Sequence, residues 1–118
     1  LMGMMDSLKL CKFILFGGIT LTPIVKWYHE VTGKEMTIDD FMKTGERIFN
    51  LKRLYNVRLG ISRKDDTLPY RSQTFKRVGK GLTPNLPPLG RMLGEYYELR
   101  GWTEDGIPTP EKIKELGL

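Results

Sequence analysis

Apolar and polar residues alternate along much of this chain with the spacing of amphipathic helices. The longest such stretch begins at Thr37 and ends at Gly60, with apolar residues recurring three or four positions apart. Thr37 is a favoured helix-capping residue, acidic side chains at Asp39 and Asp40 suit the first turn, and Gly60 is a typical stop. The pattern therefore predicts a central helix over 37–60, around which the other segments pack.

One broad side of this helix is expected to face the core, and its members are Ile38, Phe41, Gly45, Ile48, Phe49, Leu51 and Tyr55. The opposite, polar side contains Asp39, Lys43, Glu46, Arg47, Asn50 and Arg53. Leu54 and Val57 lie near the polar side, so the second half of the helix is expected to be covered nearly all round, either by later segments of this chain or by another protein surface. Glycine costs about 1 kcal/mol relative to alanine inside a helix, so Gly45 predicts that another backbone crosses closely there.

Four further helices are predicted, over residues 4–16, 22–31, 88–100 and 109–117. The second of these is expected to begin with Thr22 as its cap and Pro23 as its first residue. Residues 61–88 have no sustained periodicity and contain four prolines, which indicates a long irregular loop. The predicted fold class is all-α, a multi-helical single domain over 1–118 of about five helices with that loop.

Composition supports a globular domain of ordinary size. The chain has 118 residues, of which 40% are hydrophobic and 28% charged. The apolar run from Phe13 to Leu21 is too short for a membrane span, so we expect no contact with a membrane. The start of the chain has no basic region of the kind that opens a signal peptide. Its first residue, Leu1, is not methionine, which suggests a piece of a longer protein or a numbering choice.

A single cysteine, Cys11, leaves three interpretations open. It excludes an internal disulfide, and a lone cysteine on an apolar helix face is most often a small buried hydrophobe. A nucleophile would need a base, and nothing in the sequence brings the one histidine, His29, to it. A thiolate ligand to an iron–sulfur cluster would need about three more ligands, which this chain lacks.

The net charge of +5 is concentrated in the predicted loop. Basic residues there are Arg63, Lys64, Arg71, Lys76, Arg77 and Lys80. With Tyr70 and Phe75 interleaved, they could contact phosphates and stack on bases, although no nucleic-acid-binding motif accompanies them. Asp65 and Asp66 in the same loop are interpreted as turn-forming and ion-paired rather than catalytic. Nucleic acid is therefore an unfavoured partner, and a solvated or domain-facing loop is favoured.

Four stretches in order resemble the C-terminal domain of tungsten-dependent aldehyde ferredoxin oxidoreductases, and the resemblance covers essentially the entire chain. They are Asp6–Phe13, Gly45–Leu51, Ile61–Pro69 and Glu95–Trp102. The resemblance implies a cytoplasmic enzyme that oxidises aldehydes to carboxylic acids at a tungsten or molybdenum bis-pyranopterin centre. Electrons would then pass through a [4Fe–4S] cluster to ferredoxin.

The family pattern Asp-x-x-Gly-Leu-Cys falls on residues 6–11. The resemblance therefore implies that Asp6, Leu10 and Cys11 contact the cofactors, with Asp6 on the pterin and Cys11 as a cluster thiolate. The remaining cluster cysteines would come from other domains of the same enzyme, so the isolated chain is expected to bind no cofactor and to be inactive. Two departures stand out: Lys9 replaces the family's glycine, and Leu59 replaces a glutamate after Arg58.

Two rival functions remain open from the residues themselves. The first is a free-standing basic helical module that binds nucleic acid or another polyanion, with Arg63, Lys64, Arg71, Lys76 and Arg77 on phosphates. The second is a non-catalytic structural subunit that keeps only the fold and the cysteine. A homo-oligomer is compatible with each of these readings.

Overall fold

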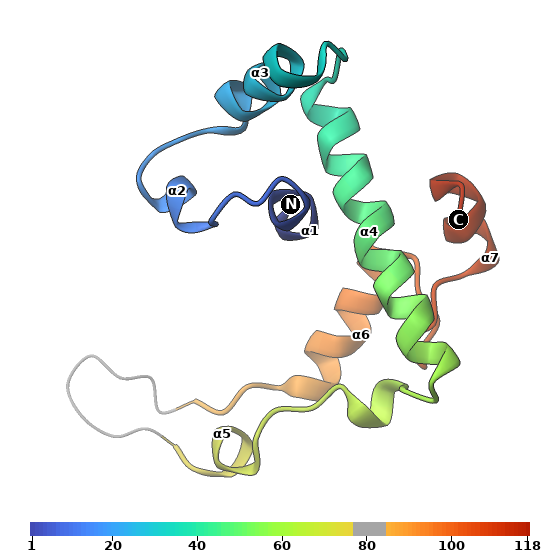
Figure 1. Ribbon diagram of the computed structural model, residues 1–118. Helices are drawn as coiled ribbons and strands as arrows, with labels where there is room; N and C mark the ends of the chain where they lie inside the picture. Colours follow the sequence, from blue (N-terminus) through green and yellow to red (C-terminus); the bar gives the residue numbers. More distant parts are fainter. Residues whose placement is uncertain (77–84) are drawn as a thin grey trace. The chain divides into compact units, whose positions relative to one another are not determined.

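Helices make up the regular secondary structure of residues 1–76 and 85–118, which are the residues that this computed structural model describes (Figure 1). The elements are α1 (Met2–Ser7), α2 (Phe13–Phe16), α3 (Leu21–Thr32), α4 (Ile38–Arg58), the 3₁₀ helix η1 (Arg63–Asp65), α5 (Tyr70–Thr74), α6 (Leu89–Arg100) and α7 (Pro110–Leu116). The only strand-like pairing among these residues is one antiparallel bridge between Trp102 and Pro108. The predicted all-α class is confirmed.

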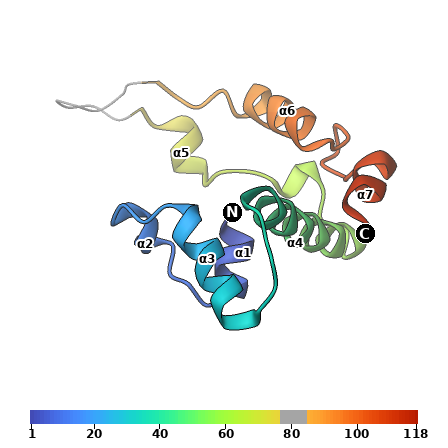
Figure 2. The ribbon, with the colours of Figure 1, turned by 90° about the horizontal axis from the view of Figure 1, so that it is seen from above.

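The chain divides into two compact units. The first contains residues 1–52 and 114–118, and the second contains residues 53–113. The long helix α4 belongs to both, because the division falls between Lys52 and Arg53 (Figures 1 and 2). The prediction of a single domain over 1–118 stays a prediction.

The first unit is built on an apolar cluster from α1, α3 and α4. Its buried members are Met4, Met5, Ile24 and Phe41. Side chains from the segments between these helices pack against the cluster, among them Leu8, Leu10 and Ile14. Both α1 and α3 contribute buried residues to this cluster (Figure 2).

Gly45 marks the place where α1 crosses α4, as its position in the apolar stripe predicts. A Cβ atom built on Gly45 would lie 3.3 Å from the backbone nitrogen of Leu1 and 3.4 Å from Cβ of Met4. Gly3 of α1 is equally close to α4, since a Cβ there would lie 3.1 Å from Cγ2 of Ile48. Two glycines facing each other let the backbones of the two helices approach closely.

The beginning of α4 matches its sequence signals. The amide of Asp40 donates to Oγ1 of Thr37 at 3.0 Å, and the amide of Thr37 donates to Oδ2 of Asp40 at 3.0 Å. This reciprocal pair satisfies backbone donors that have no partner within the helix. The helix ends at Arg58, and Gly60 follows in the left-handed region with φ of 88°.

The predicted helix over 4–16 is wrong in its middle. Residues 8–12 interrupt it, leaving α1 and α2 as separate short helices. The prediction of a start at Thr22 and Pro23 is also off by two residues, because α3 begins at Leu21 with Thr20 as its cap residue. Proline is tolerated in the first turn, where amides have no helical partner, so Pro23 does not fix the first residue.

The second half of α4 buries a different side than predicted. Arg53, placed on the polar side, is only 7% exposed, whereas Leu51 and Tyr55, placed on the core side, are 57% and 63% exposed. Leu54 and Val57 are half-buried, as their departure from the pattern suggested. The reason is an ion pair: Arg53 is held inside by a carboxylate, which hydropathy alone does not reveal.

The predicted irregular loop over 61–88 contains two short helices, η1 and α5. Nε2 of Gln73 in α5 donates to Oγ1 of Thr67 at 3.0 Å. This bond connects α5 to the segment that precedes it. Arg77 and Lys80, counted in the basic run, lie outside the described residues. In the part of the chain described here, we find no helix with the length and apolar character that crossing a bilayer requires.

Candidate functional site

The segment that interrupts the first predicted helix is a tight helix-ending turn. The amide of Lys9 donates to the carbonyl of Asp6 at 3.1 Å, and the amide of Leu10 donates to the carbonyl of Met5 at 3.0 Å. These two bonds form the Schellman arrangement, in which the residue after the cap is left-handed. We call residues 6–12 the Asp6–Lys12 turn.

Lys9 occupies the left-handed position of that turn. Its φ is 59°, and no other non-glycine residue among those described has a positive φ. Glycine is the usual residue at this position because a Cβ atom crowds the backbone there. The backbone of this chain therefore adopts the conformation that the glycine of the resembling family pattern would favour, with lysine in its place.

Asp6 and Cys11 both face outward from the turn. Cys11 is exposed, which is unusual for a cysteine outside a disulfide and makes the buried-hydrophobe interpretation wrong. Asp6 is exposed in the last turn of α1, where the helix dipole disfavours a negative charge. Within the described residues, neither side chain has a hydrogen-bond or ion-pair partner. An exposed thiol and an unpaired carboxylate thus lie five residues apart on one turn.

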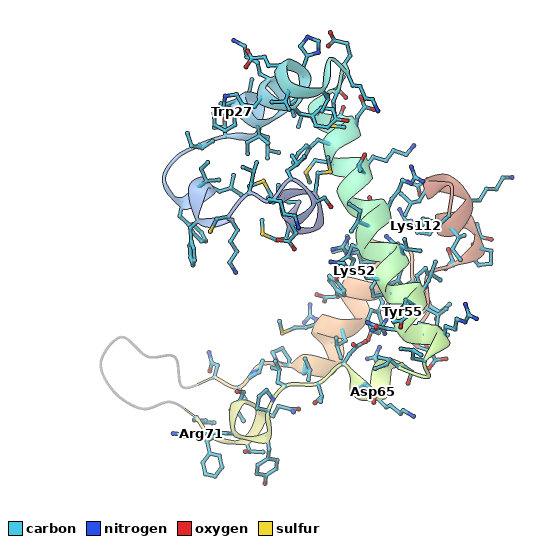
Figure 3. All side chains as sticks on the ribbon, viewed as in Figure 1. Trp27, Lys52, Tyr55, Asp65, Arg71 and Lys112 are labelled. Atoms are coloured by element: carbon cyan, nitrogen blue, oxygen red, sulfur yellow. The ribbon has the colours of Figure 1, made fainter. Side chains whose placement is uncertain are left out.

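The two leucines of the turn face the other way. Leu8 and Leu10 pack against the apolar cluster and line an open apolar groove of about 250 Å³ together with Ile24, Trp27, Tyr28, Val31 and Thr32 of α3. Trp27 on α3 is labelled in Figure 3. The leucines anchor the turn to the first unit, so any contact of Leu10 with a cofactor falls to its backbone or to the exposed edge of its side chain.

The structure gives no support to a Cys–His pair. Nδ1 of His29 lies 3.4 Å from Oε1 of Glu35, and no hydrogen bond among the described residues joins the imidazole to Cys11. No group of three or more His, Cys, Asp or Glu side chains within the described ranges is arranged to hold a metal ion. A metal centre at Cys11 therefore needs ligands that this chain does not supply.

A cluster of charged and aromatic side chains lies in the second unit, and the sequence pattern did not indicate it. We call it the Arg53 cluster: Arg53, Arg63, Asp66, Tyr97 and Trp102. Nη1 and Nη2 of Arg53 donate to the two carboxylate oxygens of Asp66 at 2.9 and 2.6 Å, and Nε donates to the carbonyl of Gly106 at 2.7 Å. The hydroxyl of Tyr97 donates to Asp66 as well.

Aromatic faces complete this cluster. The guanidinium carbon of Arg53 lies 5.1 Å from the ring centre of Trp102, and that of Arg63 lies 5.3 Å from the ring centre of Tyr97. Both distances are within the range of a cation–π interaction. Gly106 is required here, because a Cβ atom at that position would overlap the Arg53 guanidinium.

The electrostatics of the cluster follow from its pairing. Burial alone would raise the pKa of Asp66, but the hydrogen bonds from Arg53 and Tyr97 and the charge of Arg53 outweigh it and lower that pKa. Burial alone would lower the pKa of Arg53, and the bonds and charge of Asp66 raise it instead. Burial and then the bond to Asp66 raise the pKa of Tyr97 to about 12. At neutral pH, Arg53 and Asp66 are therefore charged and the phenol of Tyr97 is protonated, which keeps the ion pair and the hydrogen bond in place.

Asp65 is turn-forming and Asp66 is ion-paired, so the sequence-based interpretation holds in part for each carboxylate. Oδ2 of Asp65 accepts from the amide of Ser62 at 2.9 Å and caps η1, where Figure 3 labels it. The ionic partner of Asp66 is Arg53, not the adjacent Arg63 or Lys64. No sequence signal links Arg53 to Asp66 across 13 positions.

The basic run is less available than its sequence suggested. Arg63 donates to the carbonyls of Glu104 and Gly90 at 3.2 and 3.0 Å, so its guanidinium is committed to the second unit. Lys64, Arg71 and Lys76 are exposed, with Arg71 projecting from α5 (Figure 3). Three exposed cations beside Tyr70 and Phe75 remain from the proposed phosphate-binding set among the described residues.

Comparison with known families gives a match along the entire chain. A family model described as "Aldehyde ferredoxin oxidoreductase, domains 2 & 3" matches residues 1–118. The tungsten-containing aldehyde ferredoxin oxidoreductase of Pyrococcus horikoshii is 40% identical over 122 residues, covering 100% of this chain and 19% of that protein. The corresponding protein of Pyrococcus furiosus is 39% identical over 122 residues, with 100% and 20% covered.

Two further relatives have other names. A protein of Pyrococcus furiosus named aliphatic sulfonate oxidoreductase, WOR-like subunit, is 31% identical over 121 residues and is covered over 19% of its length. Among solved structures, a chain of the active-site complex BamBC of benzoyl coenzyme A reductase superposes with a TM-score of 0.67 at 30% identity. That match covers 85% of this chain and 14% of the other. The chain thus spans about a fifth of the length of the curated relatives it matches.

Proposed function

This chain belongs to the aldehyde ferredoxin oxidoreductase family, and we propose that it supplies one cluster thiolate, Cys11, and one pterin-binding carboxylate, Asp6, to such an enzyme. One observation carries the proposal: the Asp6–Lys12 turn presents an exposed thiol and an unpaired carboxylate at the family's motif positions. Side chains whose placement is energetically unfavourable in the local structure, and which have no hydrogen-bond or ion-pair partner there, are typical of functional sites.

The chemistry of these side chains fits the proposed groups. A thiolate is the usual ligand of a [4Fe–4S] cluster, and four are normally needed, so the other three would come from outside this chain. A carboxylate can accept two hydrogen bonds from a planar edge of N–H groups, as a pterin presents. When bound, the tungsten centre would supply the oxidation of an aldehyde to a carboxylic acid. Water provides the added oxygen atom, and two electrons and two protons are released.

Within that reaction, the residues of this chain have holding roles. Cys11 would fix the cluster, through which electrons leave one at a time toward ferredoxin. Asp6 would fix the orientation of the pterin relative to that cluster. The Schellman turn sets the backbone between the two side chains, and Leu8 and Leu10 anchor it to the apolar cluster of the first unit.

The substrate is not set by this segment in our proposal. Relatives and structural neighbours that share it have names referring to aldehydes, an aliphatic sulfonate and a coenzyme A thioester. One helical segment serving differently named enzymes supports a role in holding cofactors rather than in selecting a substrate. We assign the aldehyde activity from the relatives that are 40% and 39% identical to this chain.

The proposal is tested in the complete enzyme that contains this segment. Cys11→Ala is expected to lower the iron and sulfide content and to abolish or alter the EPR signal of the reduced cluster. Asp6→Asn is expected to lower the tungsten and pterin content while iron is retained. Lys12→Gln, which changes another side chain of the same turn, is the control. It should retain the iron and sulfide content as well as the tungsten and pterin content. A full, unaltered cluster in Cys11→Ala would reject the proposal.

The rival functions predict other results. A polyanion-binding module would bind nucleic acid with an affinity that falls steeply with salt, and Lys64, Arg71 and Lys76 would carry it. The commitment of Arg63 to carbonyls of the second unit weakens that reading. A non-catalytic subunit would lack three closely spaced cysteines elsewhere in its coding sequence, whereas an active enzyme would contain them.

A further inference from the structure

Lys9 has a conformational cost that its own chain does not offset. A non-glycine residue in the left-handed region is strained because its Cβ atom crowds the backbone, and Lys9 has a φ of 59°. Its side chain is exposed and has no hydrogen-bond, ion-pair or ring partner within the described residues. Glycine would form the same turn more cheaply, so nothing in the fold of this chain explains the lysine.

We propose that Lys9 provides a fixed positive charge that raises the reduction potential of the cluster bound by Cys11. This inference rests on the proposed function of Cys11. Reduction adds one electron to the cluster, and a nearby cation stabilises the reduced form more than the oxidised form. Net charge around an iron–sulfur cluster is one of the factors that set its potential.

Lys9 is held near Cys11 by the turn. Lys9 precedes Cys11 by two residues, so their Cα atoms lie at most about 7 Å apart. An exposed lysine side chain this close along the chain can reach a cluster held by Cys11, whereas charges farther apart than about 8 Å are largely screened at physiological ionic strength. The Schellman hydrogen bonds hold this part of the backbone in one conformation, so the position of the Lys9 backbone relative to Cys11 is set by the turn.

Lys12 is a natural comparison, because it is also a lysine and is even closer to Cys11 in sequence. Its ammonium nitrogen lies 5.9 Å from the ring centre of Phe13, so its charge is already engaged with an aromatic face. Its backbone is in the ordinary helical region, with φ of −57°. Lys12 therefore has neither the strain nor the free ammonium that distinguishes Lys9.

In the complete enzyme, a cluster held by Cys11 would supply one-electron transfer, first from the tungsten centre to the cluster and then from the cluster to ferredoxin. A higher cluster potential makes the first of these steps more favourable and the second less so. Through the cluster potential, Lys9 would thus influence how the overall free-energy change is divided between the two electron transfers. It would not take part in bond making or breaking.

The test is the midpoint potential of the cluster, measured by EPR at a series of fixed potentials in the complete enzyme. Lys9→Gly is expected to shift the midpoint to a more negative value, and Lys9→Arg to retain it. Lys12→Gln should produce a smaller shift than Lys9→Gly. An unchanged midpoint in Lys9→Gly, with the cluster intact, would overturn the inference and leave the role of Cys11 standing.

Stability of the same variants supplies an independent measurement. If the left-handed strain of Lys9 is uncompensated, Lys9→Gly should be as stable as the natural protein or more stable in urea denaturation. A loss of stability in Lys9→Gly would mean that the lysine serves the fold, which contradicts the inference. A cluster that survives Cys11→Ala would instead reject the proposed function itself.

Discussion

Asp66 is the residue on which the second unit depends most directly. Its carboxylate accepts both Nη atoms of Arg53 and the hydroxyl of Tyr97, and Arg53 is only 7% exposed. Removing one partner of a buried pair typically costs about 3 to 5 kcal/mol because the other charge stays buried and uncompensated. Asp66→Asn is therefore expected to lower the free energy of unfolding by about 3 kcal/mol, measured by urea denaturation.

Glu98→Gln is a suitable control for that variant. Glu98 is an exposed carboxylate on α6, so its neutralisation is expected to change stability by less than about 0.5 kcal/mol. Equal stability of Asp66→Asn and the natural chain would contradict a structural role for the Arg53 cluster.

Tyr97 gives the same cluster a pH dependence. Its pKa in the folded chain is raised to about 12 from an ordinary value of 10.0, so the protonated phenol is favoured by folding. The resulting stability is fully present below pH 10 and is lost as the pH rises toward 12. The free energy of unfolding should fall over that window by at most about 2 to 3 kcal/mol more in the natural chain than in Tyr97→Phe.

The measurement is urea denaturation of both proteins at several pH values between 8 and 12. Comparing the two cancels the titration of the other tyrosines and the lysines. Parallel loss of stability in both proteins would show that the phenol of Tyr97 does not titrate as its burial requires.

At the scale of single helices, the crossing of α1 and α4 depends on Gly45. The Cβ contacts of 3.3 and 3.4 Å to α1 leave no room for a branched side chain, and overpacking typically costs about 1 to 3 kcal/mol. Gly45→Val is expected to destabilise the chain by about 2 kcal/mol in urea denaturation, in the middle of that range.

Gly94 offers a matched control with the opposite sign. It also lies inside a helix, α6, but a Cβ there would meet nothing within 4 Å. Gly94→Ala is therefore expected to stabilise the chain by about 0.5 to 1 kcal/mol through helix propensity. If both variants shift stability in the same direction, close packing at Gly45 is not what sets the crossing.

Helix ends were predictable where their signals are local. The Thr37 cap, with Asp40 in the first turn, and the left-handed Gly60 lie where the sequence indicated. The end of α1 was missed because its left-handed residue is Lys9, and lysine gives no such signal. The fold class followed from periodicity, whereas the break that forms the candidate site did not.

The hydropathy pattern does not predict contacts between residues that are far apart in the sequence. Arg53 was assigned to the polar side of α4 because hydropathy treats every arginine alike, and its buried partners Asp66 and Tyr97 are 13 and 44 positions away. The site residues Asp6 and Cys11 came from family resemblance. Their exposure on one turn, which the structure adds, was not derivable from composition or spacing.

At the scale of the whole molecule, two compact units share α4, and the first of them carries the Asp6–Lys12 turn. The second unit contains the Arg53 cluster and the exposed cations Lys64, Arg71 and Lys76. The chain corresponds to about a fifth of the length of the curated relatives, and in our proposal residues outside it supply the rest of the cofactor site. The proposed function depends on whether Cys11 ligates iron in the complete enzyme.

The most direct measurement is anomalous diffraction at the iron absorption edge from crystals of the complete enzyme. The account predicts an iron position within bonding distance of Sγ of Cys11, with the other cluster ligands contributed from outside residues 1–118. An iron–sulfur cluster whose ligands are all found elsewhere, with Sγ of Cys11 bound to no metal, would contradict it.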